Sequence, residues 1–137
     1  MKQEDKELLL KDLCARLSYG VICGDGYGNV LELNGISKPN CITFKCATKS
    51  FWTTNLDECK PYLFPMSSMT EEQKEEYYHI VNYISSDDTK TWMEGEFIYV
   101  DTTQFLRLIN FYHRNHLDYR GLINGGLAID ATGLNIY

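Results

Sequence analysis

Two neighbouring segments in the first half of the chain alternate apolar and polar residues, and this pattern constrains the fold most. The segments are "VLELNGI" (30–36) and "CITFKCA" (41–47). Successive side chains of a strand point to opposite faces of a sheet, so such alternation is typical of strands with one buried face. Together with the short apolar run "GVIC" (20–23), these segments predict a three-stranded antiparallel meander.

Glycine-rich stretches mark the turns of this meander. "GDGYGN" (24–29) separates the first two strands, and we expect Asn34-Gly35 to turn the chain again because both residues tolerate positive φ. A phosphate-binding loop is disfavoured at 24–29, since a strand-like segment follows the glycines where such a loop needs a helix. Weaker strand patterns occur at 50–54 and 95–100.

Three other segments have the periodicity of amphipathic helices. The first, 4–17, is expected to end before Gly20, and the second to begin at Thr70, which forms a capping box with Gln73. The third is expected to begin at Asp101 or Thr102. The predicted buried stripes are Leu10, Leu13, Cys14 and Leu17; Tyr77, Ile80, Val81 and Ile84; and Phe105, Leu108, Ile109 and Tyr112.

These elements predict an α+β fold in a single domain, 1–137. We expect an antiparallel sheet of three to five strands with three main helices packed on it. A chain of 137 residues has the usual length of one domain, and no linker or internal repeat divides it.

Composition excludes several classes of function. The net charge is −6 and the 13 lysines and arginines are scattered, so we expect no nucleic-acid partner. The five cysteines form no Cys-x-x-Cys pair and no secretory signal opens the chain, which indicates free thiols and a cytoplasmic location. No run of about 20 apolar residues is present, so we expect no membrane partner.

The segment "NFYHRNHLDYRG" (110–121) contains a polar cluster of His113, His116 and Asp118. One interpretation is a small hydrolase or metal-dependent enzyme that uses these three side chains. The other is structural: the histidines end the third helix, and Asp118 caps a short fourth one. We favour the structural interpretation and assign no catalytic residue, no metal ligand and no cofactor.

Two sets of residues are candidates for protein contact. A proline-punctuated region contributes several aromatic and apolar side chains, which would either cover a core edge or form a docking patch. They are Trp52, Tyr62, Phe64 and Met66. Tyr119 and Arg120 belong to residue types that are common in interface hot spots, but the same pair could hold the C-terminal segment in place.

Three blocks, 11–21, 60–73 and 115–137, resemble a family of small proteins encoded by gut Bacteroidetes and by their phages or mobile elements. The chain departs from the family pattern at Ser18, Phe64 and Leu117, where proline, arginine and phenylalanine are usual. The resemblance implies a phage or mobile-element origin and brings no activity or ligand with it. We therefore expect a non-enzymatic cytosolic accessory protein that binds another protein.

Overall fold

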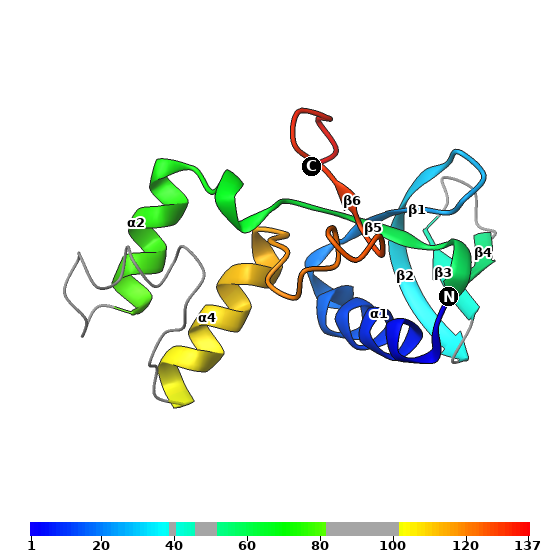
Figure 1. Ribbon diagram of the computed structural model, residues 1–137, viewed down its shortest axis with the longest axis horizontal. Helices are drawn as coiled ribbons and strands as arrows, with labels where there is room; N and C mark the ends of the chain where they lie inside the picture. The colour runs from blue at the N-terminus through cyan, green and yellow to red at the C-terminus, as the bar shows by residue number, and fades with distance from the viewer. Residues whose placement is uncertain (39–40, 46–51, 82–101) are drawn as a thin grey trace.

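The computed structural model describes residues 1–38, 41–45, 52–81 and 102–137, and these form an α+β fold (Figure 1). Its α-helices are α1 (Gln3–Arg16), α2 (Glu71–Ile80) and α4 (Thr102–Arg114). Single 3-10 turns are η1 (Leu17–Tyr19), η2 (Leu56–Glu58) and η3 (Met66–Ser68). The strands are β1 (Ile22–Gly24), β2 (Val30–Lys38), β3 (Cys41–Phe44), β4 (Trp52–Asn55), β5 (Lys60–Leu63) and β6 (Ile129–Asp130).

The six described strands form one mixed sheet in the order β4-β3-β2-β1-β5-β6. The predicted meander is present, because β1, β2 and β3 pair antiparallel in sequence order. The expected strand count and the purely antiparallel sheet were wrong, since β6 adds a sixth strand parallel to β5. A strand of two residues is too short to show any periodicity, so sequence patterning could not reveal it.

The Asn34-Gly35 pair does not turn the chain, which corrects the turn prediction. Both residues lie inside β2, and the pairing with β3 shifts between Leu33 and Gly35. Neither residue has positive φ, which a tight hairpin turn of this type requires. The pair instead marks an irregularity in a nine-residue strand, of the kind that a β-bulge produces.

Helix α1 is present, but it buries a different face from the predicted one. Cys14 and Leu17 are exposed, whereas Leu9, Asp12 and Arg16 are fully buried beside Leu13. The predicted stripe consisted of apolar residues only, whereas the charged residues Asp12 and Arg16 occupy two of the buried positions of the helix. Gly20 ends the segment in the left-handed conformation (φ 70°), as predicted.

Of the two later helices, α2 begins as predicted, whereas α4 differs from expectation at one position of its buried stripe. Helix α2 begins with the predicted capping box, in which Thr70 Oγ1 accepts from the Gln73 amide and Gln73 Oε1 accepts from the Thr70 amide. On α4, Leu108 and Tyr112 are buried as expected, but Phe105 is 51% exposed. Ile84, Asp101 and the strand expected at 95–100 lie outside the described residues.

The buried side chains form two clusters. The first lies between α1 and the sheet and includes Leu9, Leu33 and Phe44, while the second lies between α2 and α4 and includes Tyr77 and Phe111. Figure 1 shows the corresponding arrangement, with α1 against the sheet and the α2–α4 pair at the other end of the molecule. Of the described helices, α1 packs on the sheet while α2 and α4 pack on each other, whereas we expected all three main helices to lie on the sheet.

Candidate functional site

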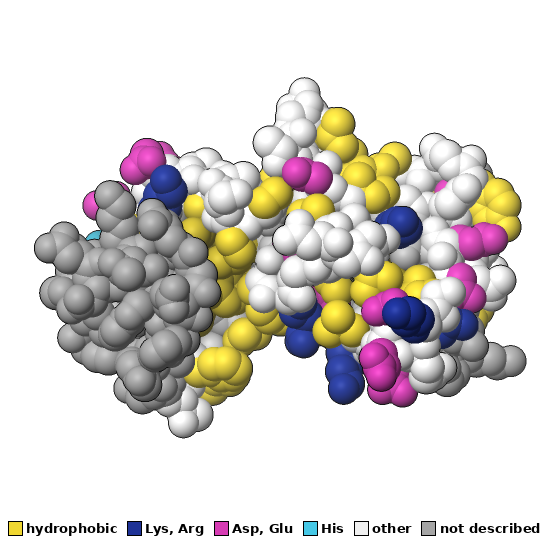
Figure 2. All heavy atoms as spheres, in the orientation of Figure 1, with side chains coloured by type: hydrophobic (Ala, Val, Ile, Leu, Met, Phe, Trp, Pro, Cys, Tyr) yellow, Lys and Arg dark blue, Asp and Glu magenta, His cyan; other side chains and the backbone are white. Residues whose placement is uncertain are grey.

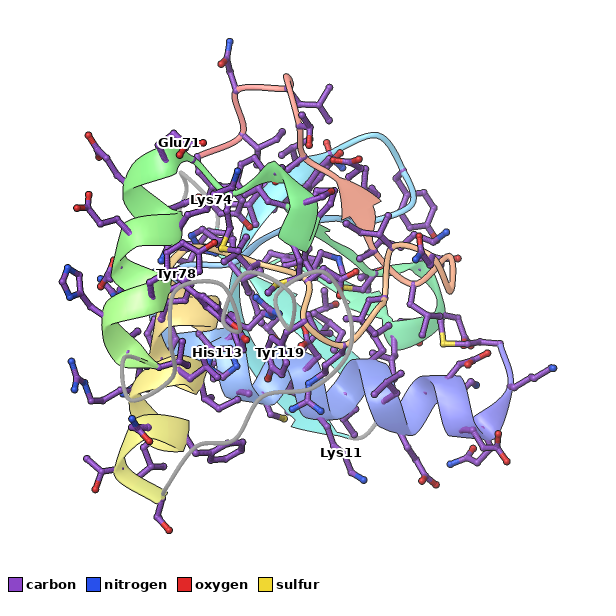
Figure 3. The ribbon with its side chains drawn as sticks, turned by 60° about the vertical axis from the view of Figure 1, so that its left-hand side comes forward. Lys11, Glu71, Lys74, Tyr78, His113 and Tyr119 are labelled. Atoms are coloured by element: carbon purple, nitrogen blue, oxygen red, sulfur yellow. The ribbon has the colours of Figure 1, made fainter. Side chains whose placement is uncertain are left out.

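A group of polar side chains joins the two ends of the molecule, and we call it the polar junction. It consists of Asp12, Arg16, His113, Tyr119 and Arg120. These residues come from the last turns of α1, the last turn of α4 and the segment that follows α4. Figure 3 shows His113 and Tyr119 close together in the interior, where they form a hydrogen bond.

The centre of the polar junction is a buried ion pair within α1. Arg16 Nε donates to Asp12 Oδ2 over 2.7 Å, and both side chains are inaccessible to solvent. Arg16 Nη2 also donates to the Leu117 carbonyl over 2.7 Å, which ties α1 to the segment after α4. Arg120 Nε lies 3.2 Å from Asp12 Oδ1, without hydrogen-bond alignment. The carboxylate of Asp12 therefore lies between two guanidinium groups.

Tyr119 packs against this pair. Its hydroxyl is 2.9 Å from His113 Nε2, and its ring stacks on Tyr112 with centroids 4.9 Å apart. The guanidinium groups of Arg16 and Arg120 lie 5.5 and 5.1 Å from its ring centroid, within the range of cation–π contacts. Burial, reinforced by the nearby Arg16, lowers the pKa of His113. Tyr119 and Arg120 therefore both contact other residues of the polar junction.

His116 has a different partner from His113. Its backbone has positive φ (54°), and its ring stacks on the Tyr137 ring with centroids 3.7 Å apart. The Tyr137 hydroxyl donates to the Tyr62 carbonyl and accepts from the Ile22 amide, so the end of the chain is fixed to β1 and β5. Burial, with a smaller contribution from Arg16, lowers the pKa of His116 to about 4.

Asp118 binds backbone amides, although the helix that we expected it to cap is absent. Residues 119–128 form successive turns, and the only regular element after them is β6. The carboxylate nevertheless accepts from the amides of Leu122 and Ile123, each over 2.9 Å. The prediction of a helix cap was therefore wrong: the accepting amides lie four and five residues after Asp118, beyond the positions that a helix cap binds, and Gly121 and Gly126 have positive φ, which interrupts a helical conformation.

The structure does not bring His113, His116 and Asp118 together as one reactive site. The first contacts Tyr119, the second stacks on Tyr137, and both oxygens of the third accept from the backbone. Within the four described ranges, no group of three or more His, Cys, Asp or Glu side chains is arranged to hold a metal ion. The three residues stabilise the segment after α4.

The predicted docking residues 62–66 are only partly accessible. Phe64 and Met66 pack against the α2–α4 cluster, and the Phe64 ring lies 5.9 Å from that of Tyr137. The backbone of Phe64 also pairs with the segment after α4, through hydrogen bonds to His116 and from Asp118. Tyr62 lies in β5, and Trp52 is the first residue of β4. Residues 62–66 therefore connect the two clusters.

Sequence reasoning missed the two residues at the centre of the polar junction. Asp12 and Arg16 are four residues apart in a helix, a spacing that is usually read as an exposed ion pair. This spacing indicates that the two side chains can form an ion pair, but it does not indicate that the ion pair is buried. The pair is enclosed by a segment about a hundred residues later in the chain, which includes Leu117 and Tyr119.

Comparisons with known proteins add no further constraint. No family model, curated protein or solved structure matches the chain. In the part of the chain that the structure describes, no helix has the length and apolar character needed to cross a membrane.

The pKa of His116 predicts that stability falls in acid. The unfolded chain takes up a proton near pH 6.5, but the folded chain does so only near pH 4, so stability is lost as the pH falls between these values. The slope should stay below roughly 1.4 kcal/mol per pH unit, the limit for one group, because solvent screens a partly exposed ring. Replacing His116→Asn, a residue that tolerates positive φ, should flatten this dependence in urea unfolding. Part of the slope should remain, because the pKa of His113 is also lowered.

His79→Asn is the matched control for this experiment, since His79 is exposed on α2. We expect it to keep the pH dependence of the unmodified protein. Equal slopes for the His116→Asn variant and the unmodified protein would contradict the assignment of the acid sensitivity to His116.

Proposed function

We propose that this chain is a non-enzymatic protein-binding protein, and that a partner docks on the exposed face of α4. The observation that carries the proposal is the exposure of two adjacent large apolar side chains, Phe105 at 51% and Leu106 at 58%. Single exposed apolar residues are ordinary, but two large ones exposed in the same helical turn enlarge the apolar surface that another protein can contact.

The shape of the surface supports this choice. Figure 2 shows hydrophobic side chains over α4, beside an indentation between α4 and α1. An indented apolar surface excludes water from an inserted side chain more fully than a flat one, and such centres dominate interface energetics.

The charge around the indentation indicates the chemistry of the partner. Lys and Arg side chains lie on its α1 side in Figure 2, and Figure 3 shows Lys11 pointing away from α1. Lys11 and Arg120 are both exposed, and Lys11 makes no ion pair with another described residue. A segment with apolar side chains flanked by acidic ones would complement this surface.

This surface differs from the two candidate contact surfaces that the sequence suggested. Phe64, Met66 and Tyr119 are engaged inside the protein, whereas Phe105 and Leu106 are not covered to the same extent. The enzyme alternative has no comparable support, because His113, His116 and Asp118 have separate structural partners. The resemblance of three segments to proteins of phages and mobile elements supports such an origin and, with it, a partner from the bacterial host cell.

The test is a quantitative binding experiment with Leu106→Glu. The protein is first used to capture and identify partners from a bacterial lysate, and the dissociation constant is then measured with each purified partner. Loss of a hot-spot contact costs about 2 kcal/mol, so the dissociation constant should rise about 30-fold. Glutamate is a good helix former, and the circular dichroism spectrum should not change.

Leu134→Glu is the matched control, because Leu134 is 51% exposed in the C-terminal segment, away from α4. We expect it to bind like the unmodified protein. Equal binding by the Leu106→Glu variant would overturn the proposal. A dimer that this substitution converts to a monomer would also overturn it, since the docked molecule would then be a second copy of the chain.

A further inference from the structure

A second surface, distant in sequence from α4, contains a polar pocket of about 430 Å³. It lies between the β3–β4 pair, the turn that follows β1, and η2. Its volume falls within the range of ordinary ligand pockets, roughly 300–1,000 Å³. The lining side chains are Tyr27, Asn29, Cys41, Thr53, Thr54, Asn55 and Glu58.

The turn that forms one wall is held by Asp25. This carboxylate is fully buried, and it accepts from the amides of Tyr27 and Asn29 and from Asn29 Nδ2, over 2.7 to 3.1 Å. Gly26 has positive φ (81°), and a Cβ there would come within 3.0 Å of the Glu58 side chain. The turn therefore packs closely on η2, and its conformation is set before any ligand arrives.

Glu58 is held from two sides. Thr54 Oγ1 donates to Glu58 Oε2 over 3.2 Å, and the Tyr27 hydroxyl donates to the same carboxylate, which raises the pKa of Tyr27. Thr54 Oγ1 also lies 3.4 Å from the carbonyl of Asp25. The wall on the η2 side is thus built from partnered groups, and a pre-organised wall costs little free energy to order on binding.

Other groups in the lining remain available to a ligand. No described residue forms a hydrogen bond with the side chains of Thr53 and Asn55, or donates to Asn29 Oδ1. A hydroxyl and an amide supply both donors and acceptors, and the Tyr27 side chain, 66% exposed, adds an aromatic surface. The pocket can therefore form several hydrogen bonds with a ligand while the Tyr27 ring covers an apolar face of that ligand.

The charge of the lining selects among ligand classes. Among the lining residues that the structure describes there is one carboxylate and no lysine or arginine, which disfavours phosphate and other anions. The carboxylate already accepts from two hydroxyls, so an ammonium group would have to compete with them. A neutral polyhydroxylated ligand needs no counter-charge, and the C–H groups on one face of a sugar ring carry a partial positive charge that the negative face of an aromatic ring attracts.

We propose that this pocket binds a neutral saccharide, with the ring of Tyr27 against one sugar face and the side chains of Asn29, Thr53 and Asn55 hydrogen-bonded to its hydroxyls. The inference does not depend on the proposed function, because α4 contributes no residue to the pocket.

The test is a titration of the full chain with candidate ligands, in which NMR measures the backbone amide chemical shifts. The probes are glucose, galactose, N-acetylglucosamine and maltose, with inorganic phosphate and putrescine as the anionic and cationic alternatives. We expect at least one sugar to shift the amides of Tyr27, Asn29 and Thr53–Asn55 in a saturable manner, with millimolar affinity. Tyr27→Ala and Asn55→Ala should each weaken binding about tenfold or more.

Phe105→Ala is the matched control, since it removes an exposed aromatic ring from α4 and should leave sugar binding unchanged. Absence of any saturable shift with all four sugars would overturn the inference. Saturable binding of putrescine or phosphate in their place would also overturn it, because a charged ligand would then define the pocket. Neither outcome affects the docking proposal, which the Leu106→Glu variant tests separately.

Discussion

Replacing Arg16→Met should destabilise the protein by about 3–5 kcal/mol, the largest effect that we expect from one substitution. Asp12 and Arg16 are both fully buried, so the variant leaves a buried carboxylate without its main partner. Arg120, whose side chain is 30% exposed and not aligned for a hydrogen bond, compensates only in part. The Leu117 carbonyl also loses its donor.

The size of the loss should depend on pH. A buried carboxylate without a partner is costly because it is charged, and acid neutralises carboxylates. The stability difference between the variant and the unmodified protein should therefore shrink as the pH falls. Urea unfolding at neutral and at mildly acidic pH measures this difference, with the unmodified protein compared at each pH.

Two further variants make the result decisive. Arg114→Met removes an exposed ion pair with Glu76 and should cost less than about 1 kcal/mol. The double variant Asp12→Leu with Arg16→Met removes both buried charges, and it should recover most of the lost stability. A double variant as unstable as the single one would show that an unpaired buried charge is not the cause.

Asp118→Ala should cost about 3 kcal/mol, since it removes a charged acceptor from two backbone amides at once. Leu122 is fully buried, so water cannot replace the carboxylate at its amide. Asp118→Asn keeps one acceptor oxygen and should lose about half as much. Unfolding in urea gives the free energies, and hydrogen exchange should show lost protection at the amides of Leu122 and Ile123.

Asp130→Ala is the matched control for this prediction. Asp130 Oδ1 accepts from the Thr132 amide over 2.9 Å, a similar local contact, but the side chain is exposed. Its loss should cost less than about 1 kcal/mol, because water can take the place of the carboxylate. Equal losses at Asp118 and Asp130 would contradict the importance of burial at Asp118.

A comparison of α2 with α1 shows which structural features can be predicted from local sequence. The capping box of α2 was predicted residue by residue, because it involves only Thr70 and Gln73 and depends on local backbone geometry. The buried face of α1 was not, because it depends on which distant groups reach the helix. Arg16 is buried because it contacts Leu117 and Tyr119, and no local sequence pattern predicts these contacts.

The same distinction applies to the histidine cluster. Local sequence placed His113, His116 and Asp118 within six residues and made a shared site conceivable. The positive φ of His116 turns its ring toward Tyr137, while His113 remains on the helix face that meets Tyr119. The left-handed backbone conformation of His116 therefore separates its side chain from that of His113, which a continuous helix would have placed on the same face.

By itself, the sequence determined the meander of β1 to β3 and the existence and approximate limits of the described helices. These features depend on periodicity and on hydrogen bonds between residues close in the chain. The tertiary structure alone decided that β6 lies parallel to β5, that an ion pair is buried in α1, and that Phe105 is exposed. Burial is a property of what packs against a residue, and its neighbours here come from segments that are far apart in sequence.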